Sequence, residues 1–149
     1  MELWRISNYA DLSGGGGLQA AGRWHTRGKR IVYLADHPAS ALLEMLVHMD
    51  RALIPATYCL LRVVVSENVV MDMIGTNTLA SDWRTQPALT RQVGDQWLDQ
   101  SATALLQVPS VIVPDGKNFL LNPAHPDAAK VAITEIVNAP FDRRLLSES

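Results

Sequence analysis

A short stretch near the N-terminus combines an arginine, an aromatic ring and a histidine. It reads Gly22-Arg23-Trp24-His25, and the loop that follows, 26–30, carries one lysine and two arginines. A guanidinium can bind phosphate oxygens in a bidentate manner, and a neighbouring aromatic ring offers a surface on which a flat ligand can stack. The pattern is therefore compatible with one or two phosphates of a small ligand. Taken alone, the residue types favour the plainer interpretation, a surface arginine beside a core tryptophan.

Glu44 is a second candidate, and its position follows from helical geometry. The segment from about Pro38 to Arg51 has the spacing of a helix, with a predicted buried stripe of Ala39, Leu42, Leu43, Leu46 and Val47. Glu44 falls opposite this stripe and shares a narrow polar strip with His48, four residues further on. The strip either faces solvent with a weak Glu–His pair or turns a carboxylate toward a cleft.

Three more polar residues lie in or near predicted strands. Tyr33 interrupts an apolar strand, where a half-buried tyrosine is ordinary. Ser110 lacks the Gly-x-Ser-x-Gly elbow of hydrolase nucleophiles, so a hydrogen-bonding role is favoured over a serine hydrolase that uses Ser110 and His125. Asn118, like the run 122–126, is by default turn chemistry.

The composition indicates one ordinary folded domain. The 149 residues are 48% apolar and 19% charged, enough for a core without disulfide or metal support, and we expect a single domain over 1–149. A net charge of −2 with one short basic patch argues against general nucleic-acid binding. The histidines and the lone Cys59, which we expect to be buried, form no metal motif, so no metal or cofactor is expected. With no signal peptide and no apolar run of about 18 residues, we expect a soluble cytoplasmic protein without membrane contact.

Short strands and few helices predict an α+β domain, with short mixed β-sheets and flanking helices. Strands are expected at 30–35, 58–65, 69–74, 109–114, 118–121 and 131–136, with 58–65 and 69–74 joined as neighbours at 66–68. Helices are expected at 38–51, 83–106 and 127–130. We expect Gly14 to Gly17 to form a mobile loop, because no Gly-Lys-Ser/Thr follows to make it a P-loop.

Taken in order, these motifs resemble a known family. The runs Gly22-Arg23-Trp24-His25, Val32-Tyr33-Leu34-Ala35 and 38–48 look like the first half of a RES domain. The runs Gly94-Asp95-x-Trp97-Leu98, Val108-Pro109-Ser110 and 118–127 look like its second half. The family is named after an arginine, a glutamate and a serine, which fall on Arg23, Glu44 and Ser110, and its active-site tyrosine falls on Tyr33. Residues 50–91 match only loosely.

The resemblance implies a fold similar to ADP-ribosyltransferases of the diphtheria-toxin group and a toxin that degrades NAD⁺, its substrate, at the nicotinamide–ribose bond. Under it, Glu44 would stabilise the oxocarbenium-like ribose and Arg23 would hold the pyrophosphate or a ribose. Tyr33, helped by Trp24, would stack on the nicotinamide, and His25 is counted among the NAD-binding residues. The remaining two expected site residues, Ser110 and Asn118, would orient the amide or the ribose hydroxyls.

Members of the family differ in the acceptor, which is water, inorganic phosphate or a protein. Transferases that modify arginine often carry an acidic residue two positions before the catalytic glutamate, and Leu42 at that position favours a small acceptor. The resemblance also implies a cognate antitoxin, usually with an Xre-type helix-turn-helix domain, and leaves a homodimer open. The alternatives are an ADP-ribosyltransferase that modifies a cellular protein and a non-catalytic module that binds NAD or ADP-ribose.

Overall fold

The computed structural model describes residues 1–146, so the last three residues of the predicted domain lie outside the described part. One seven-stranded sheet runs through the molecule in the order β4-β5-β6-β2-β1-β3-β7. Its strands are β1 (Glu2–Ile6), β2 (Val32–Ala35), β3 (Thr57–Val65), β4 (Met71–Met73), β5 (Leu105–Pro109), β6 (Lys117–Leu121) and β7 (Val131–Pro140). Only the β4–β5 pair is parallel in this sheet. The predicted α+β class is confirmed.

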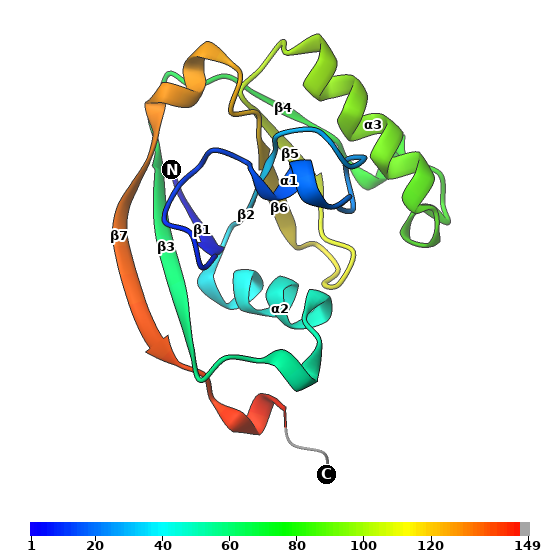
Figure 1. Cartoon of the computed structure of the whole chain (residues 1–149). Coiled ribbons are helices and arrows are strands. Elements are labelled where there is room, and N and C mark those ends of the chain that lie inside the picture. Colours follow the sequence, from blue (N-terminus) through cyan, green and yellow to red (C-terminus); the bar gives the residue numbers. More distant parts are fainter. Residues whose placement is uncertain (147–149) are drawn as a thin grey trace.

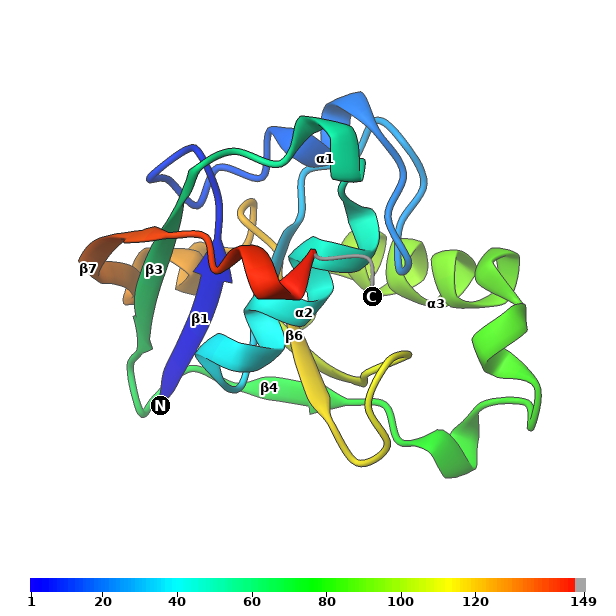
Figure 2. The ribbon, with the colours of Figure 1, turned by 90° about the horizontal axis from the view of Figure 1, so that it is seen from below.

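The helices are few. They are α1 (Gly16–Gln19), α2 (Pro38–His48) and α3 (Pro87–Gln100), with short 3-10 helices at Arg51–Leu53, Thr76–Thr78, Trp83–Thr85, Pro126–Lys130 and Arg143–Leu145. Figures 1 and 2 both show β3 and β7 at one end of the molecule and α3 at the other, with α2 between them. Helix α2 starts as the sequence predicts, because Pro38 occupies the first turn and His37 Nδ1 accepts the Ala39 N–H at 3.1 Å.

Successive strand residues alternate between two hydrophobic clusters, one on each face of the sheet. In β6, Phe119 and Leu121 belong to the first cluster, and Leu120 belongs to the second. The second cluster also holds three buried tryptophans, Trp24, Trp83 and Trp97. Because apolar side chains cover both faces of the central strands, a polar side chain on the face of the second cluster is a candidate for a functional role. Such side chains are Tyr33 on β2 and Asn118 on β6.

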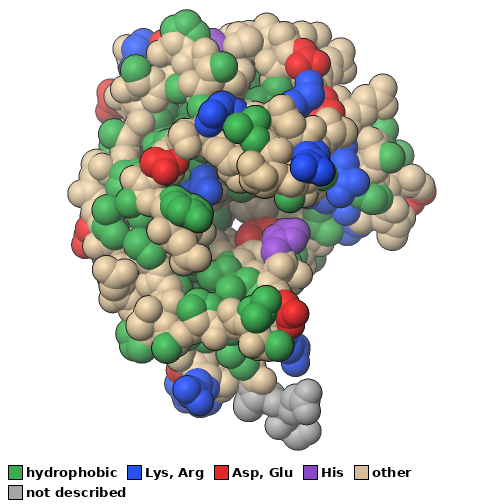
Figure 3. Space-filling model, viewed as in Figure 1, with side chains coloured by type: hydrophobic (Ala, Val, Ile, Leu, Met, Phe, Trp, Pro, Cys, Tyr) green, Lys and Arg blue, Asp and Glu red, His purple; other side chains and the backbone are tan. Residues whose placement is uncertain are grey.

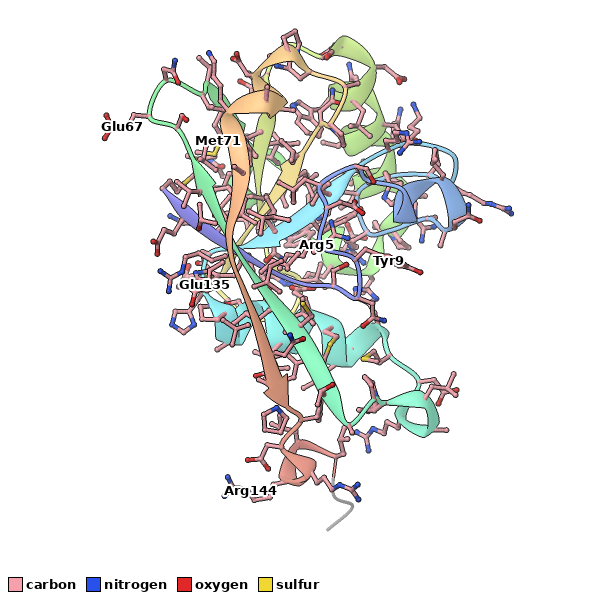
Figure 4. All side chains as sticks on the ribbon, turned by 60° about the vertical axis from the view of Figure 1, so that its left-hand side comes forward. Arg5, Tyr9, Glu67, Met71, Glu135 and Arg144 are labelled. Carbon is pink, nitrogen blue, oxygen red and sulfur yellow. The ribbon has the colours of Figure 1, made fainter. Side chains whose placement is uncertain are left out.

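Strands β3 and β7 form a long antiparallel pair that extends past the other strands (Figures 1 and 4). Their register shifts between Arg62 and Val63. The Arg62 guanidinium pairs with Glu135 of β7 at 3.2 Å and lies 5.0 Å from the centre of the Trp4 ring. These are contacts of partly exposed side chains, and none of the predicted site residues lies on β3 or β7.

Three predictions about strand pairing and element boundaries are wrong. Strand β4 pairs with β5, not with β3, because β3 is already bonded to β1 on one side and β7 on the other. The helix predicted over 83–106 ends at Gln100, where Ser101 adopts a left-handed conformation (φ 50°), and Leu105 and Leu106 belong to β5. Of the strand predicted over 109–114, only Pro109 lies in a strand, as the last residue of β5, and the residues after Ser110 bend into a turn at 114–115. Short apolar runs do not by themselves distinguish helix from strand.

Two further predictions fail around the first two helices. In α2 the predicted buried stripe is partly in solvent, with Leu43 41% and Val47 57% exposed, while Ala41 is buried. The helix is therefore rotated relative to the prediction, packing on β1 and β2 with one side only. The glycine run is not a loop throughout: it enters α1, where a Cβ on Gly17 would overlap the Lys29 backbone. Cys59, predicted to be buried, is only half-buried and packs against the first cluster.

Candidate active site

The Glu44 carboxylate is held by side chains from two other elements. Glu44 lies in the middle of α2, and its Oε1 accepts a hydrogen bond from Asn118 Nδ2 at 2.8 Å and a longer one from Ser110 Oγ at 3.4 Å. Its second oxygen, Oε2, has no hydrogen-bond partner among residues 1–146. One oxygen is thus fixed by the protein, and the other remains available to a ligand.

Ser110 also builds the turn that brings its hydroxyl to Glu44. Its Oγ accepts the N–H groups of Ile112 and Val113 at 3.1 and 3.2 Å, and its own N–H donates to the Gly116 carbonyl. A hydroxyl has one proton, and here it is directed at Glu44. His125 Nδ1 accepts the Asp127 N–H instead of contacting Ser110. The serine hydrolase alternative therefore lacks a nucleophile–base pair in this structure.

A narrow pocket lies beside the carboxylate. Its lining residues are Ser40, Leu43, Glu44, Ser110, Ile112, Val113, Gly116, Lys117 and Asn118. The pocket admits roughly one water molecule, so it would receive the edge of a ligand rather than a whole nucleotide. Figure 3 shows this side of the molecule hollowed above α2, with acidic and histidine side chains in the hollow and Lys and Arg side chains gathered on the segment above. Acidic and basic groups thus border the same hollow.

The Tyr33 hydroxyl is enclosed by the 22–25 turn. Tyr33 Oη lies 2.7 Å from His25 Nδ1 and accepts the Trp24 N–H at 3.1 Å. Burial raises the pKa of Tyr33 far above its ordinary value, so the hydroxyl keeps its proton. A Cβ at position 22 would collide with this hydroxyl, which explains the glycine in the turn.

The Tyr33 and Glu44 groups are neighbours on one sheet face. Tyr33 pairs with Leu120, and Ala35 pairs with Asn118, in the antiparallel ladder of β2 and β6. Residues directly opposite each other point to the same face, and diagonal neighbours are about 7–8 Å apart. Tyr33 and Asn118 are such a diagonal pair, so the structure brings together four of the predicted residues: Tyr33, Glu44, Ser110 and Asn118.

Arg23 reaches across to the backbone of the 83–85 turn. Its Nη2 donates to the carbonyls of Trp83 and Arg84 at 2.7 and 2.6 Å, and the guanidinium lies 5.7 Å from the Trp83 ring centre. Its Nε is buried without a partner in the described chain, and partial burial, aided by the charge of Arg91, lowers the pKa of Arg23. Arg23 therefore holds a structural contact that its sequence context did not indicate.

Trp24 and His25 lie behind the site rather than on its surface. They are 2% and 3% exposed, and the Trp24 ring packs 6.1 Å from that of Trp83. The turn that carries them is fastened to α3 by two residues that sequence reasoning missed. Thr90 Oγ1 donates to the Arg23 carbonyl at 2.6 Å, and Arg91 Nε donates to the Gly22 carbonyl at 2.8 Å.

A signal for this contact was present in the sequence. Gly94 belongs to one of the motifs noted above, and a Cβ there would overlap the Trp24 carbonyl, so the glycine permits α3 to touch the turn.

Within residues 1–146, no three His, Cys, Asp or Glu side chains gather where they could hold a metal ion. The described helices are also too short or too polar to cross a membrane.

Comparisons with known proteins bear on the family and the fold of the chain. A protein of Pseudomonas putida KT2440 named "Toxin Res" is 46% identical over 135 residues, covering 89% of this chain and 92% of its own. The "Prs ADP-ribosylating toxin" of Sphingobium sp. YBL2 is 36% identical over 157 residues, covering 99% and 98%. In fold, the chain is similar to a chain of the M. tuberculosis MbcT–MbcA toxin–antitoxin complex, with a TM-score of 0.73 at 16% identity over 93% of this chain and 84% of that one. Residues 2–142 match the RES domain profile, and the chain belongs to the RES domain family.

Proposed function

We propose that the protein is the toxin of a toxin–antitoxin pair and that it degrades NAD⁺ by cleaving the nicotinamide–ribose bond. The observation that carries the proposal is the Glu44 carboxylate, which is fixed at Oε1 by Asn118 and, among the described residues, has no partner for Oε2 beside a pocket. Relatives named as toxins, which match most of the chain, support the toxin role. Acidic and basic groups around one hollow suit a ligand with a cationic ring and anionic phosphates.

The proposed reaction needs a negative charge more than it needs an acid. The bond between ribose C1′ and the ring nitrogen breaks with both electrons moving to nitrogen, so nicotinamide leaves as a neutral molecule without a proton. The ribose becomes oxocarbenium-like, as in glycoside cleavage. A carboxylate placed near C1′ stabilises that charge. Water then forms the new C–O bond and releases a proton, or phosphate forms it and gives the 1-phosphate of ADP-ribose.

The other residues have supporting roles in this proposal. Asn118 and Ser110 hold Oε1, so the carboxylate is ordered before the ribose arrives. The Tyr33 ring borders the nicotinamide position, in front of the buried Trp24 and His25. Two nitrogens of Arg23, Nε and Nη1, have no protein partner in the described chain. Nε is buried, whereas Nη1 can take a phosphate or ribose oxygen while Nη2 keeps its backbone contacts.

Transfer of ADP-ribose to a protein is the second candidate. It is favoured by one observation, the relative named "Prs ADP-ribosylating toxin", which matches the chain over nearly its whole length. The acceptor would then replace water at C1′, with the same residues stabilising the ribose. A non-catalytic module would bind the same ligand in the same pocket without turnover.

A cognate antitoxin is part of the proposal. The solved neighbour is a toxin in complex with its antitoxin. A protein that drains NAD⁺ must be held inactive in its own cell, and an Xre-type partner is what the family resemblance leads us to expect. Expression of the chain alone should stop growth and lower cellular NAD⁺, and co-expression of the protein encoded next to it should restore both. Growth at normal NAD⁺ with the active chain alone would refute this part.

The enzymatic proposal is tested by product identification. Purified protein is incubated with NAD⁺, with and without inorganic phosphate, and the products are separated by chromatography and weighed by mass spectrometry. Free ADP-ribose indicates hydrolysis, and its 1-phosphate indicates phosphorolysis. A parallel incubation of labelled NAD⁺ with cell lysate detects transfer to protein. NAD⁺ that binds but stays intact in every arm leaves the binding module as the function.

A further inference from the structure

We propose that His25, as the neutral tautomer with its proton on Nε2, is a positioning residue that orients the Tyr33 hydroxyl and the 22–24 turn, and that it does not touch substrate. The assignment of the tautomer rests only on geometry. The effect on turnover rests on the proposed function. His25 is 3% exposed, so its ring has no surface to offer a ligand.

The proton on the imidazole can be placed from its neighbours. Nε2 lies 3.0 Å from the Ala20 carbonyl oxygen, which can only accept, so Nε2 carries the proton. In a neutral ring Nδ1 is then an acceptor. It receives the Gly22 N–H at 3.2 Å and lies 2.7 Å from Tyr33 Oη.

The proton on the tyrosine follows from the same reasoning. Oη accepts the Trp24 N–H at 3.1 Å, and its single proton points at His25 Nδ1. The hydroxyl proton is therefore used inside the protein, and a ligand would meet the Tyr33 ring rather than an O–H donor. His25 links the end of α1, through Ala20, to strand β2, through Tyr33.

The charge state of His25 suits this role. Burial has the largest effect on the pKa of His25 and lowers it. Hydrogen bonding to the Ala20 and Gly17 carbonyls raises the pKa to a smaller extent. The charges of Asp95 and Arg91 have the smallest effects, raising and lowering it respectively. The ring is therefore neutral at physiological pH, as the network requires. A protonated ring would turn Nδ1 into a donor facing the Gly22 N–H.

The 22–24 turn is also held by hydrogen bonds that do not involve His25. A substitution of His25 should therefore change the rate of catalysis more than the stability of the fold. Thr90 and Arg91 of α3 hold the Arg23 and Gly22 carbonyls without help from His25. Loss of the Nδ1 acceptor should therefore leave the fold standing while Tyr33 and Arg23 shift relative to Glu44. A small displacement in a site of this kind can cost up to about 100-fold in rate.

Two substitutions separate the ring nitrogens. In His25→Asn the amide oxygen takes the place of Nδ1, and in His25→Gln the amide nitrogen takes the place of Nε2. We expect kcat for NAD⁺ cleavage to stay within about 3-fold of wild type in His25→Asn and to fall about 10-fold or more in His25→Gln, with similar KM and similar melting temperatures. Equal kcat in the two variants, or the reverse order, would overturn the positioning role.

A second measurement does not depend on activity. ¹⁵N NMR of the imidazole in the wild-type protein at neutral pH should show an unprotonated Nδ1 and a protonated Nε2 for His25, assigned by comparison with His25→Asn. The opposite tautomer, or a charged ring, would overturn the proposal even if both variants are active. If wild-type protein does not turn over NAD⁺, the proposed function fails, and the NMR result still decides the tautomer.

Discussion

Replacement of Arg23 by lysine measures how much its backbone contacts contribute. In the folded protein Nη2 makes two short hydrogen bonds from a charged donor, to the Trp83 and Arg84 carbonyls. Lysine keeps the charge but has one nitrogen in place of the planar guanidinium, so we expect it to recover about one of the two bonds. A net hydrogen bond to a charged group contributes about 1.5–3 kcal/mol, and because Arg23 is partly exposed to solvent we expect a smaller loss, about 1–2 kcal/mol.

The assay is urea unfolding without NAD⁺, supported by thermal melting. For a chain of this length, a loss of about 1–2 kcal/mol corresponds to a melting temperature lower by roughly 2–8 °C. Arg27→Lys is the matched control, because Arg27 is exposed in the same segment and has no hydrogen bond within the described residues. If Arg23→Lys melts like this control and loses only NAD⁺ affinity, the backbone contacts contribute nothing and Arg23 serves the substrate alone. If Arg23→Lys is destabilised but fully active per folded molecule, Arg23 is not part of the active site.

Other positions give independent tests. Asn118→Ala should lower turnover more than Ser110→Ala, because the Asn118 bond to Glu44 is 2.8 Å long and the Ser110 bond 3.4 Å; steady-state kinetics decides, and the reverse order would contradict the geometry. Gly94→Ala should destabilise by about 3 kcal/mol, since its Cβ would overlap the Trp24 carbonyl, whereas Gly16→Ala, with open space, should not; equal unfolding curves would refute this. Because burial lowers the pKa of His25, the unfolded chain binds the proton more readily, and stability should fall as pH drops below about 6.5. Urea unfolding at several pH values should show a shallower fall in His25→Asn, and an unchanged fall would rule out His25 as its source.

Much of the site could be predicted from the sequence because its motifs are local. Tyr33, Glu44 and Ser110 each lie in a short run whose residue types carry the resemblance, and the structure places these three and Asn118 on one side of the sheet. The residues that support the site without lining it could not be predicted in this way. Thr90 acts through contacts about 67 positions away in sequence, which no spacing rule anticipates.

The wrong predictions about the fold also concern features that depend on contacts between distant parts of the chain. The order of strands depends on which edges are free, and β3 could not pair with β4 once β1 and β7 had taken its two sides. The apolar residues Leu43 and Val47 on α2 misled the burial prediction, because a helix of this kind is apolar nearly all round and periodicity does not say which side meets the sheet. Leu105 and Leu106 were assigned to a helix for a similar reason.

The central claim is that the Glu44 carboxylate stabilises the ribose cation during NAD⁺ cleavage. Glu44→Gln keeps the side-chain shape and an oxygen for the Asn118 bond but removes the charge. The direct measurement is kcat for nicotinamide release, with the NAD⁺ dissociation constant and melting temperature determined alongside, and with exposed Glu67→Gln as control. We predict a fall in kcat of roughly 10²-fold or more with affinity and stability nearly unchanged. Near-normal kcat in Glu44→Gln, in protein whose wild type cleaves NAD⁺, would contradict the account.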